Sequence, residues 1–173
     1  MSDRRIGLQL SDNRLRVSRL VLDSPGIHLR ELQRNLGLSF STVRYHIDGL
    51  VSEGELEGER MGRYTRLFPR SMPPEERTAC SLLREPSARA VVFELARTRV
   101  YSNKRISEAT GLGKSTVSRQ GKRLLRLGVI ERTVTPAGKV ESRLGNSAVA
   151  AAVMRFSQEG RTAVKNYIEL WDF

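Results

Sequence analysis

The sequence contains little of what redox, metal or membrane chemistry requires. Cys80 is its single cysteine, so it can form neither a disulfide framework nor a cysteine metal site, as is typical of proteins in the reducing cytosol. The two histidines, His28 and His46, lie far apart with no cysteine near them, so we expect structural roles and no metal. The most apolar stretch, residues 148–154, is far too short to cross a bilayer, and no signal peptide is evident. We therefore expect a soluble cytoplasmic protein with no membrane partner.

The patterns that mark enzymes are also missing. The sequence shows no glycine loop suited to cradling a phosphate, no paired carboxylates in an apolar setting and no nucleophile beside a base. The glycines of residues 58–62 fit a turn between two strands better than a nucleotide site. We expect a protein that is not an enzyme and that requires no cofactor.

Positive charge, in contrast, is abundant. The 173 residues include 30 lysines and arginines against 19 aspartates and glutamates, a net charge of +11. Most of the cations are arginine, whose planar guanidinium binds phosphates and guanine edges in a bidentate manner. Such a balance indicates a polyanionic partner, either nucleic acid or an anionic membrane surface.

An internal repeat organises the chain. Residues 37–43 (GLSFSTV) match residues 111–117 (GLGKSTV) at an offset of 74 positions (111 − 37). The same offset relates further positions without a gap: Val17 and Val91, Leu32 and Ile106, Leu50 and Leu124, Gly54 and Gly128, Leu56 and Ile130. One offset that satisfies all these pairs predicts two copies of one fold.

Each copy follows one order of predicted elements. In the first copy, apolar spacing and stop signals predict helices over residues 13–23, 29–36 and 40–53, with Gly37 as a helix stop and Ser39 as a helix cap, then a hairpin over 56–68. In the second copy they predict helices over 87–98, 104–110 and 114–127, then a hairpin over 129–144 that turns at 135–138. This is the winged-helix order.

The predicted fold class is therefore α+β and mainly α, with two tandem winged helix-turn-helix domains. We place the first domain at residues 1–70, a linker with a short helix at 71–86, the second domain at 87–145 and a helical segment at 146–173. Two apolar stripes mark that last segment: Val149, Ala152, Val153 and Phe156, then Val164, Tyr167, Ile168 and Trp171. The stripes could dock on the second domain or form a dimer seam, and we favour the dimer seam.

The third helix of the second copy has the pattern of a DNA-reading helix. Its predicted inner side holds Val117, Gly121, Leu124 and Leu125, and its outer side Ser115, Ser118, Arg119, Lys122 and Arg126. Residues 114–126 contain five basic residues and no acid. Such a helix suits the major groove, where arginine binds guanine and the helix N-terminus attracts phosphate.

The corresponding helix of the first copy is less basic. Its predicted inner side holds Val43, Ile47, Leu50 and Val51, and its outer side Ser41, Arg44, Tyr45 and Asp48. Asp48 stands where the second copy has Lys122, and an acid that faces phosphates is unfavourable. Residues 1–70 hold 12 basic and 9 acidic side chains, against 15 and 7 in residues 71–145. We expect the second copy to supply most of the electrostatic affinity.

At residues 25–32, 41–47 and 53–54 the sequence resembles winged-helix regulators of the ArsR/MarR-like type. The second copy matches at 111–112, 115–119 and 127–130, and the tandem arrangement is similar to archaeal regulators with two such domains. The resemblance implies sequence-specific binding of duplex DNA, as a homodimer, with each third helix in the major groove. It implies that Ser41, Thr42, Arg44, Tyr45, Lys114, Ser115, Thr116, Ser118 and Arg119 face the groove. The outer faces and the wings add Arg60, Arg63, Lys122, Arg123, Arg126 and Lys139 as candidate DNA-binding residues.

Two other functions fit parts of the pattern. Winged helices also serve as protein-interaction modules of transcription or chromosome machinery. Binding of single-stranded nucleic acid or RNA ranks below that, because it relies on stacked aromatics and Tyr45 is the only aromatic on either predicted reading face. No small-molecule effector is indicated.

Overall fold

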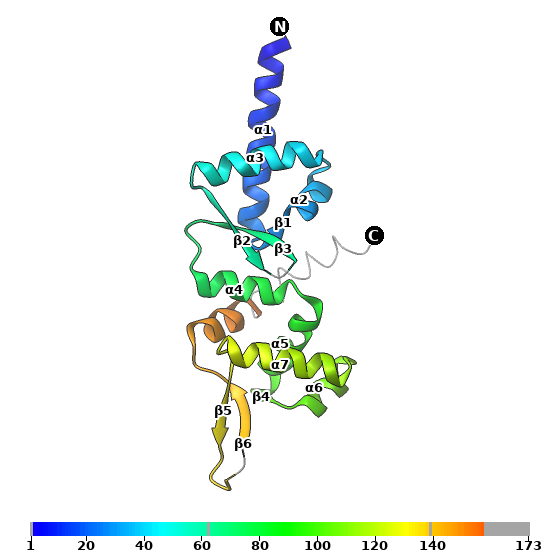
Figure 1. Cartoon of the computed structure of the whole chain (residues 1–173), viewed down its shortest axis with the longest axis vertical. Helices are drawn as coiled ribbons and strands as arrows, with labels where there is room; N and C mark the ends of the chain where they lie inside the picture. Colours follow the sequence, from blue (N-terminus) through cyan, green and yellow to red (C-terminus); the bar gives the residue numbers. More distant parts are fainter. Residues whose placement is uncertain (1, 62, 139, 158–173) are drawn as a thin grey trace. The chain divides into compact units, whose positions relative to one another are not determined.

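The computed structural model describes residues 2–61, 63–138 and 140–157, with side chains from residue 12 onward. The chain divides into two compact units, which we call unit 1 (Met1–Pro73) and unit 2 (Pro74–Phe173) (Figure 1). None of the described helices is both long enough and apolar enough to span a membrane. The described residues also contain no group of three or more His, Cys, Asp or Glu side chains arranged to hold a metal ion.

Unit 1 consists of three helices and a small antiparallel sheet. Its elements are α1 (Ser2–Asp23), β1 (Ile27–His28), α2 (Leu29–Leu36), α3 (Phe40–Ser52), β2 (Leu56–Met61) and β3 (Tyr64–Pro69). The three strands lie in the order β1-β3-β2. Apolar side chains from all three helices and the sheet form one core: Val17, Val21, Ile27, Leu32, Val43, Ile47, Leu50, Leu56 and Leu67.

Local chemistry explains where the helices of unit 1 begin and end. The His28 imidazole accepts a hydrogen bond from the backbone N–H of Glu31 and so caps α2. Gly37, with φ at +64°, ends α2, because only glycine adopts this left-handed conformation readily. The Ser39 hydroxyl then accepts from the Thr42 N–H and caps α3. The predicted stop at Gly37 and the predicted cap at Ser39 are both confirmed, and His28 has the structural role expected of it.

Unit 2 repeats this order of elements and adds helices at both ends. Its elements are α4 (Pro74–Leu83), α5 (Pro86–Thr98), β4 (Val100–Tyr101), α6 (Asn103–Thr110), α7 (Lys114–Arg126), β5 (Ile130–Val134) and β6 (Val140–Leu144), followed by helical residues 148–157. From α5 onward the elements correspond to α1–β3 of unit 1, and the sheet order β4-β6-β5 corresponds as well. The glycines after α6 and α7 match their counterparts in unit 1, with φ of +64° at Gly37 and +70° at Gly111, and +76° at Gly54 and +69° at Gly128.

Three features of the fold differ from the prediction. Helix α1 begins at Ser2, not near residue 13, and Gly7, the one glycine in this interval, does not end it. Strands β1 and β4 were not predicted, since two residues are too few to show an alternating pattern. Val51 was predicted to face inward, but 39% of its surface is exposed, because it lies in the last turn of α3 beyond the core.

The C-terminal segment packs on its own unit as far as it is described. Ala152 and Val153 are buried in the core of unit 2, and Val149 and Phe156 pack against the same core. An ion pair between Arg155 and Glu76 of α4 adds to this contact. The first apolar stripe therefore follows the docking alternative and not the dimer seam that we favoured. The second stripe (Val164, Tyr167, Ile168 and Trp171) lies outside the described residues.

Candidate nucleic-acid interface

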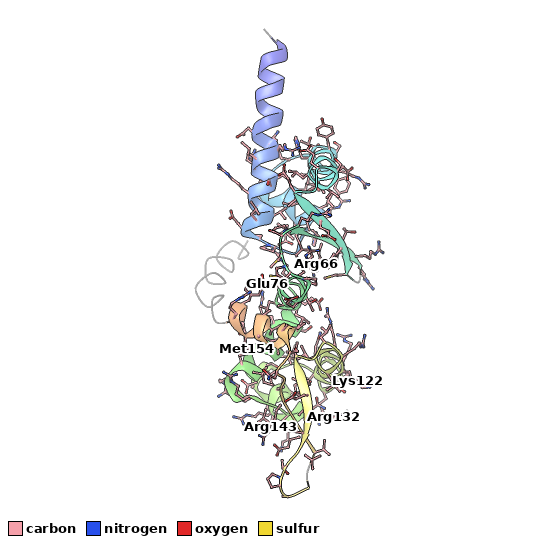
Figure 2. All side chains as sticks on the ribbon, turned by 90° about the vertical axis from the view of Figure 1, so that its left-hand side faces the viewer. Arg66, Glu76, Lys122, Arg132, Arg143 and Met154 are labelled. Carbon is pink, nitrogen blue, oxygen red and sulfur yellow. The ribbon has the colours of Figure 1, made fainter. Side chains whose placement is uncertain are left out.

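Helix α7 separates its two sides as the sequence predicts. Val117, Gln120, Gly121 and Leu124 are buried. Four of its cations are exposed, and within the described part of the chain none of them forms an ion pair: Lys114, Arg119, Lys122 and Arg126. Figure 2 shows Lys122 on α7 in unit 2. The helix thus presents free positive charge on one side and a packed apolar surface on the other.

The beginning of α7 is open to an anion. Gly113 occupies the N-cap position and supplies no side chain to the first backbone N–H groups. A Cβ atom at this position would meet nothing within 4 Å, so no neighbouring group crowds the end of the helix. The positive end of the helix dipole lies here, and exposed Lys114 and Ser115 are in the first turn. These properties suit a phosphate group.

Contacts with Tyr101 and Ser87 hold α7 in place. The Tyr101 hydroxyl donates a hydrogen bond to the Val117 carbonyl oxygen at 2.6 Å, and burial raises the pKa of this phenol. A Cβ atom at Gly121 would overlap the same hydroxyl oxygen, so α7 and β4 approach this closely only because residue 121 is glycine. On α7 itself, the Gln120 amide donates to the Ser87 hydroxyl of α5 at 3.0 Å.

Sequence reasoning did not find the contact between Tyr101 and Gly121, although the repeat holds a signal for it. At the offset of 74 residues, Tyr101 corresponds to Ile27 and Gly121 to Ile47. Both isoleucines are buried in the core of unit 1. Unit 2 thus has a large tyrosine and a glycine without a side chain at the two positions where unit 1 has isoleucines of medium size.

Arg123 differs from the other cations of α7. Its guanidinium forms two hydrogen bonds with the Glu85 carboxylate, which lies just before α5, and both side chains are about one-third exposed. This pair occupies the Arg123 donors inside unit 2. We therefore expect Arg123 to contribute less to any contact with phosphate than its exposed neighbours.

The β5–β6 hairpin of unit 2 has an apolar tip and a cationic edge. Val134 pairs with Val140 across the hairpin, and the two are 71% and 61% exposed. Arg132 is exposed and has no ion-pair partner among the described residues, and it was not among the predicted site residues. Lys139 was a predicted site residue, and it lies outside the described residues.

In unit 1, the outer side of α3 carries charge that is already paired. Arg44 and Asp48 form an ion pair one helical turn apart, at 3.4 Å between Nε and Oδ2, and both side chains are about two-thirds exposed. Asp48 thus lies on the outer side as predicted. The hydroxyl groups of Ser41 and Thr42 both hydrogen bond to the Ser39 cap. Three of the four candidate residues on this helix therefore already have hydrogen-bond or ion-pair partners in their own unit.

The remaining candidates of unit 1 are aromatic or lie in the β2–β3 hairpin. Tyr45 on α3 is 67% exposed, and Arg60 and Arg63 in the β2–β3 hairpin are exposed. Tyr64, half exposed, stacks on His28 with ring centroids 4.7 Å apart, a contact that sequence reasoning missed. His46 faces the core, where burial and then the charge of Arg14 lower its pKa, so it has the structural role predicted.

Comparison with known proteins adds evidence of two kinds. Residues 11–80 match the family model HTH_HVO_0163_N, described as an N-terminal HTH domain. A curated protein of Methanocaldococcus jannaschii, the uncharacterized HTH-type transcriptional regulator MJ1398, is 27% identical over 122 residues, which is 70% of this chain. The family match and this relative support a helix-turn-helix regulator. The chain spans about a third (31%) of the length of that relative.

Two solved structures show a weak likeness to the chain. A single-substitution mutant of Lactococcus lactis ZitR is 16% identical with a TM-score of 0.36, over 77% of this chain and 83% of that one. Human N-acetylserotonin methyltransferase in complex with SAM is 12% identical with a TM-score of 0.29, over 92% of this chain and 46% of that one. At such TM-scores neither likeness informs the fold or the function.

Proposed function

We propose that this protein is a sequence-specific, double-stranded DNA-binding transcription regulator. In this proposal each unit is a winged helix-turn-helix domain of the ArsR/MarR-like type, with α3 and α7 as the helices that enter the major groove. The matching order of elements in the two units and the family match of residues 11–80 support it. The proposal assigns no catalytic step to the protein.

The cations of α7 that have no ion-pair partner among the described residues carry the proposal. Lys114, Arg119, Lys122 and Arg126 are exposed on a helix that Tyr101 fixes from behind. Because a helix held in this way presents its cations at fixed spacing, they can bind phosphates and guanine edges without reorganising the unit. Unit 2 is then the main source of affinity. The paired Arg44 and Asp48 give α3 a smaller share.

Selection from random duplex DNA tests this function directly. The full chain is incubated with a pool of random duplexes, and the bound fraction is sequenced and then titrated by fluorescence anisotropy. We expect one enriched motif and an affinity that falls steeply as salt rises, because cations that bind phosphates release counterions. A chain that ignores duplexes at low salt, or that binds all sequences equally at every salt concentration, would contradict the proposal.

We further propose that the regulator acts as a homodimer, in which α1 pairs with its copy. Leu15 and Leu22 lie seven residues apart on α1, each is 54% exposed, and Figure 1 shows α1 extending beyond the rest of unit 1. Two exposed leucines two turns apart lie on one side of the helix and give such a pair an apolar seam.

The α1 pairing predicts a clear result for one double variant. We expect Leu15→Glu/Leu22→Glu to sediment as a monomer and the wild type as a dimer, because two carboxylates per helix would have to be buried in the pair. Truncation after residue 157 is the matched control and should leave the dimer intact. A dimer that survives the double substitution but not the truncation would place the seam in the C-terminal segment instead.

One observation favours a second candidate function, a protein-interaction module. Val134 and Val140 form an exposed apolar pair on the β5–β6 hairpin, which suits a protein surface better than solvent. A gel-shift titration with specific and non-specific competitor separates the two functions, because a protein-interaction module would show no preference for the selected motif.

A further inference from the structure

Unit 1 contains an open hollow of about 610 Å³ beside α2. His28 of β1, Arg30 and Arg34 of α2, and Tyr64 of β3 line it, together with the turn that follows α2. Its volume lies within the range of ligand sites, roughly 300–1,000 Å³. None of the residues that line it is among the candidate DNA-binding residues, so the hollow is a separate feature of unit 1.

The Tyr64 ring forms a flat platform in this hollow. It stacks on the His28 imidazole, with ring centroids 4.7 Å apart and an angle of 12° between the ring planes. His28 is held in turn by the hydrogen bond that it accepts from the backbone N–H of Glu31. His28 covers one face of the Tyr64 ring, yet half of Tyr64 is exposed, so the opposite face is open to solvent. An aromatic ring supported in this way suits a nucleic-acid base, because every base has a flat π-face that stacks on such rings.

The charge of the hollow is positive. Arg30 and Arg34 are both exposed, and their spacing of four residues places them on the same side of α2. Arg30 forms no ion pair within the described part of the chain, and its guanidinium lies 4.7 Å from the centre of the Phe40 ring. No aspartate or glutamate is among the described residues that line the hollow, since Glu31 is buried behind His28. Two arginines beside an open aromatic ring are suited to the phosphates that flank a stacked base.

Unit 2 lacks this combination of residues. At the offset of 74 residues, Ser102 corresponds to His28 and Glu108 corresponds to Arg34. Helix α6 therefore has an acid where α2 has a cation, and no imidazole is present at its start to support a second ring. The platform and its two arginines are thus a property of unit 1, and the fold that the two units share does not require them.

We propose that this hollow binds single-stranded nucleic acid. One base stacks on the open face of Tyr64, and Arg30 and Arg34 bind the neighbouring phosphates. The bases inside a duplex already stack on one another, so the site selects unpaired strands. RNA and single-stranded DNA share this chemistry, and the experiment compares them. The site goes beyond the proposed function, because no residue that lines it lies on α3 or α7.

The probes for this site are the 12-mers rU12 and dT12, which form no duplex with themselves. An abasic deoxyribose 12-mer is their matched control, because it carries the same phosphates without bases. Each is titrated into the full chain, and binding is followed by fluorescence anisotropy and by amide chemical shifts. We expect rU12 or dT12 to bind about 10-fold tighter than the abasic strand, because only a base can stack on a ring. The tighter of the two identifies the preferred sugar, and the shifts should concentrate in α2, the turn that follows it and β3.

Variants at exposed positions test the assignment. We expect Tyr64→Leu to weaken binding of the 12-mers about 10-fold, because leucine offers no ring for a base, whereas Tyr64→Phe keeps the ring and should bind as the wild type does. Arg30→Gln should weaken binding about 3-fold, since it removes one cation. Tyr45→Leu is the matched control, because Tyr45 is an exposed tyrosine of the same unit that does not line the hollow, and it should leave binding of the 12-mers unchanged. Thermal melting checks that all four variants stay folded.

A second pair of titrations separates this site from the proposed function. We expect Tyr64→Leu to bind the selected duplex as the wild type does, and Arg119→Gln to lose duplex affinity while it binds the 12-mers normally. The inference is overturned if the abasic strand binds as tightly as rU12 and dT12, if no 12-mer binds, or if Tyr64→Leu weakens binding no more than Tyr64→Phe or Tyr45→Leu. Any of these results, together with intact duplex binding, leaves the proposed function standing. Binding of a 12-mer that depends on Tyr64, by a chain that binds no duplex, would support the site and contradict the proposed function.

Discussion

Units 1 and 2 share one order of elements, but they differ in the ion pairing of the charged side chains on the outer side of the third helix. In unit 1, Arg44 is paired with Asp48. In unit 2, Lys122 stands at the position of Asp48, and it has no ion-pair partner among the described residues. Unit 2 thus keeps positive charge available for a ligand, whereas unit 1 uses part of its own charge internally. The same fold can therefore be tuned for different affinity by the pairing of its surface charges.

The two cores also differ, at positions that the repeat relates. Ile27 and Ile47 are buried in unit 1, and Tyr101 and Gly121 take their places in unit 2. The sizes compensate, so each core stays packed while its chemistry changes. Unit 2 gains a hydroxyl that donates a hydrogen bond to the backbone of α7. A repeat thus preserves the fold when paired positions change together.

The largest effect that we predict comes from breaking this compensation. Gly121→Ile alone should destabilise the protein by about 3 kcal/mol, because its Cβ would overlap the Tyr101 hydroxyl. The double variant Tyr101→Ile/Gly121→Ile places the two isoleucines of unit 1 at the corresponding positions of unit 2. It should recover most of the lost stability. Urea unfolding of the two variants measures both effects.

The matched control for this swap is Tyr101→Ile alone. It should be destabilising as well, because it removes the hydroxyl and leaves a gap beside Gly121. The compensation argument fails if the double variant is no more stable than the less stable of the two single variants.

The second prediction compares the cations of α3 and α7. Arg119→Ala and Lys122→Ala should each weaken duplex binding about 5-fold at 0.15 M salt, and the double variant about 25-fold, as expected for phosphate contacts with a salt slope of roughly −0.9 each. Arg44→Ala should weaken it less than about 2-fold, because Asp48 already pairs with Arg44. Anisotropy titrations at several salt concentrations measure these differences. Equal losses at Arg44 and Lys122 would contradict the ranking of the units.

The third prediction makes unit 1 resemble unit 2. Asp48→Lys releases Arg44 from its ion pair and adds a cation at the position of Lys122. We expect duplex binding about 5-fold tighter at 0.15 M salt and a steeper salt dependence. Stability should change little, because an exposed pair of this kind contributes little. Unchanged affinity would indicate that α3 does not lie near DNA, and Asp48→Asn serves as the intermediate case.

Much of this fold could be predicted because its signals are local. Gly37 and Ser39 mark helix ends through their own backbone and hydroxyl chemistry, and the apolar periodicity identifies the buried side of α7. Contacts between distant residues could not be predicted in the same way. The binding of Arg123 to Glu85, and of Tyr101 to Val117, depends on how the elements are placed in space. The sequence therefore identifies the candidate cations, and the contacts in the folded chain determine which of them are held in an ion pair.

The smallest predicted effect concerns the caps of α3 and α7. Ser39 caps α3, whereas Gly113 leaves α7 without a side-chain cap. Gly113→Ser fits the extended backbone at φ −60°, where an added Cβ meets nothing within 4 Å, so it should stabilise the protein by about 0.5 kcal/mol. If the open N-terminus of α7 binds a phosphate, the new hydroxyl competes for the same N–H groups, and duplex affinity should fall slightly while thermal stability rises. Opposite movements of melting temperature and affinity would locate a phosphate at this helix end. A parallel rise in both would mean that DNA contacts α7 only through its side chains.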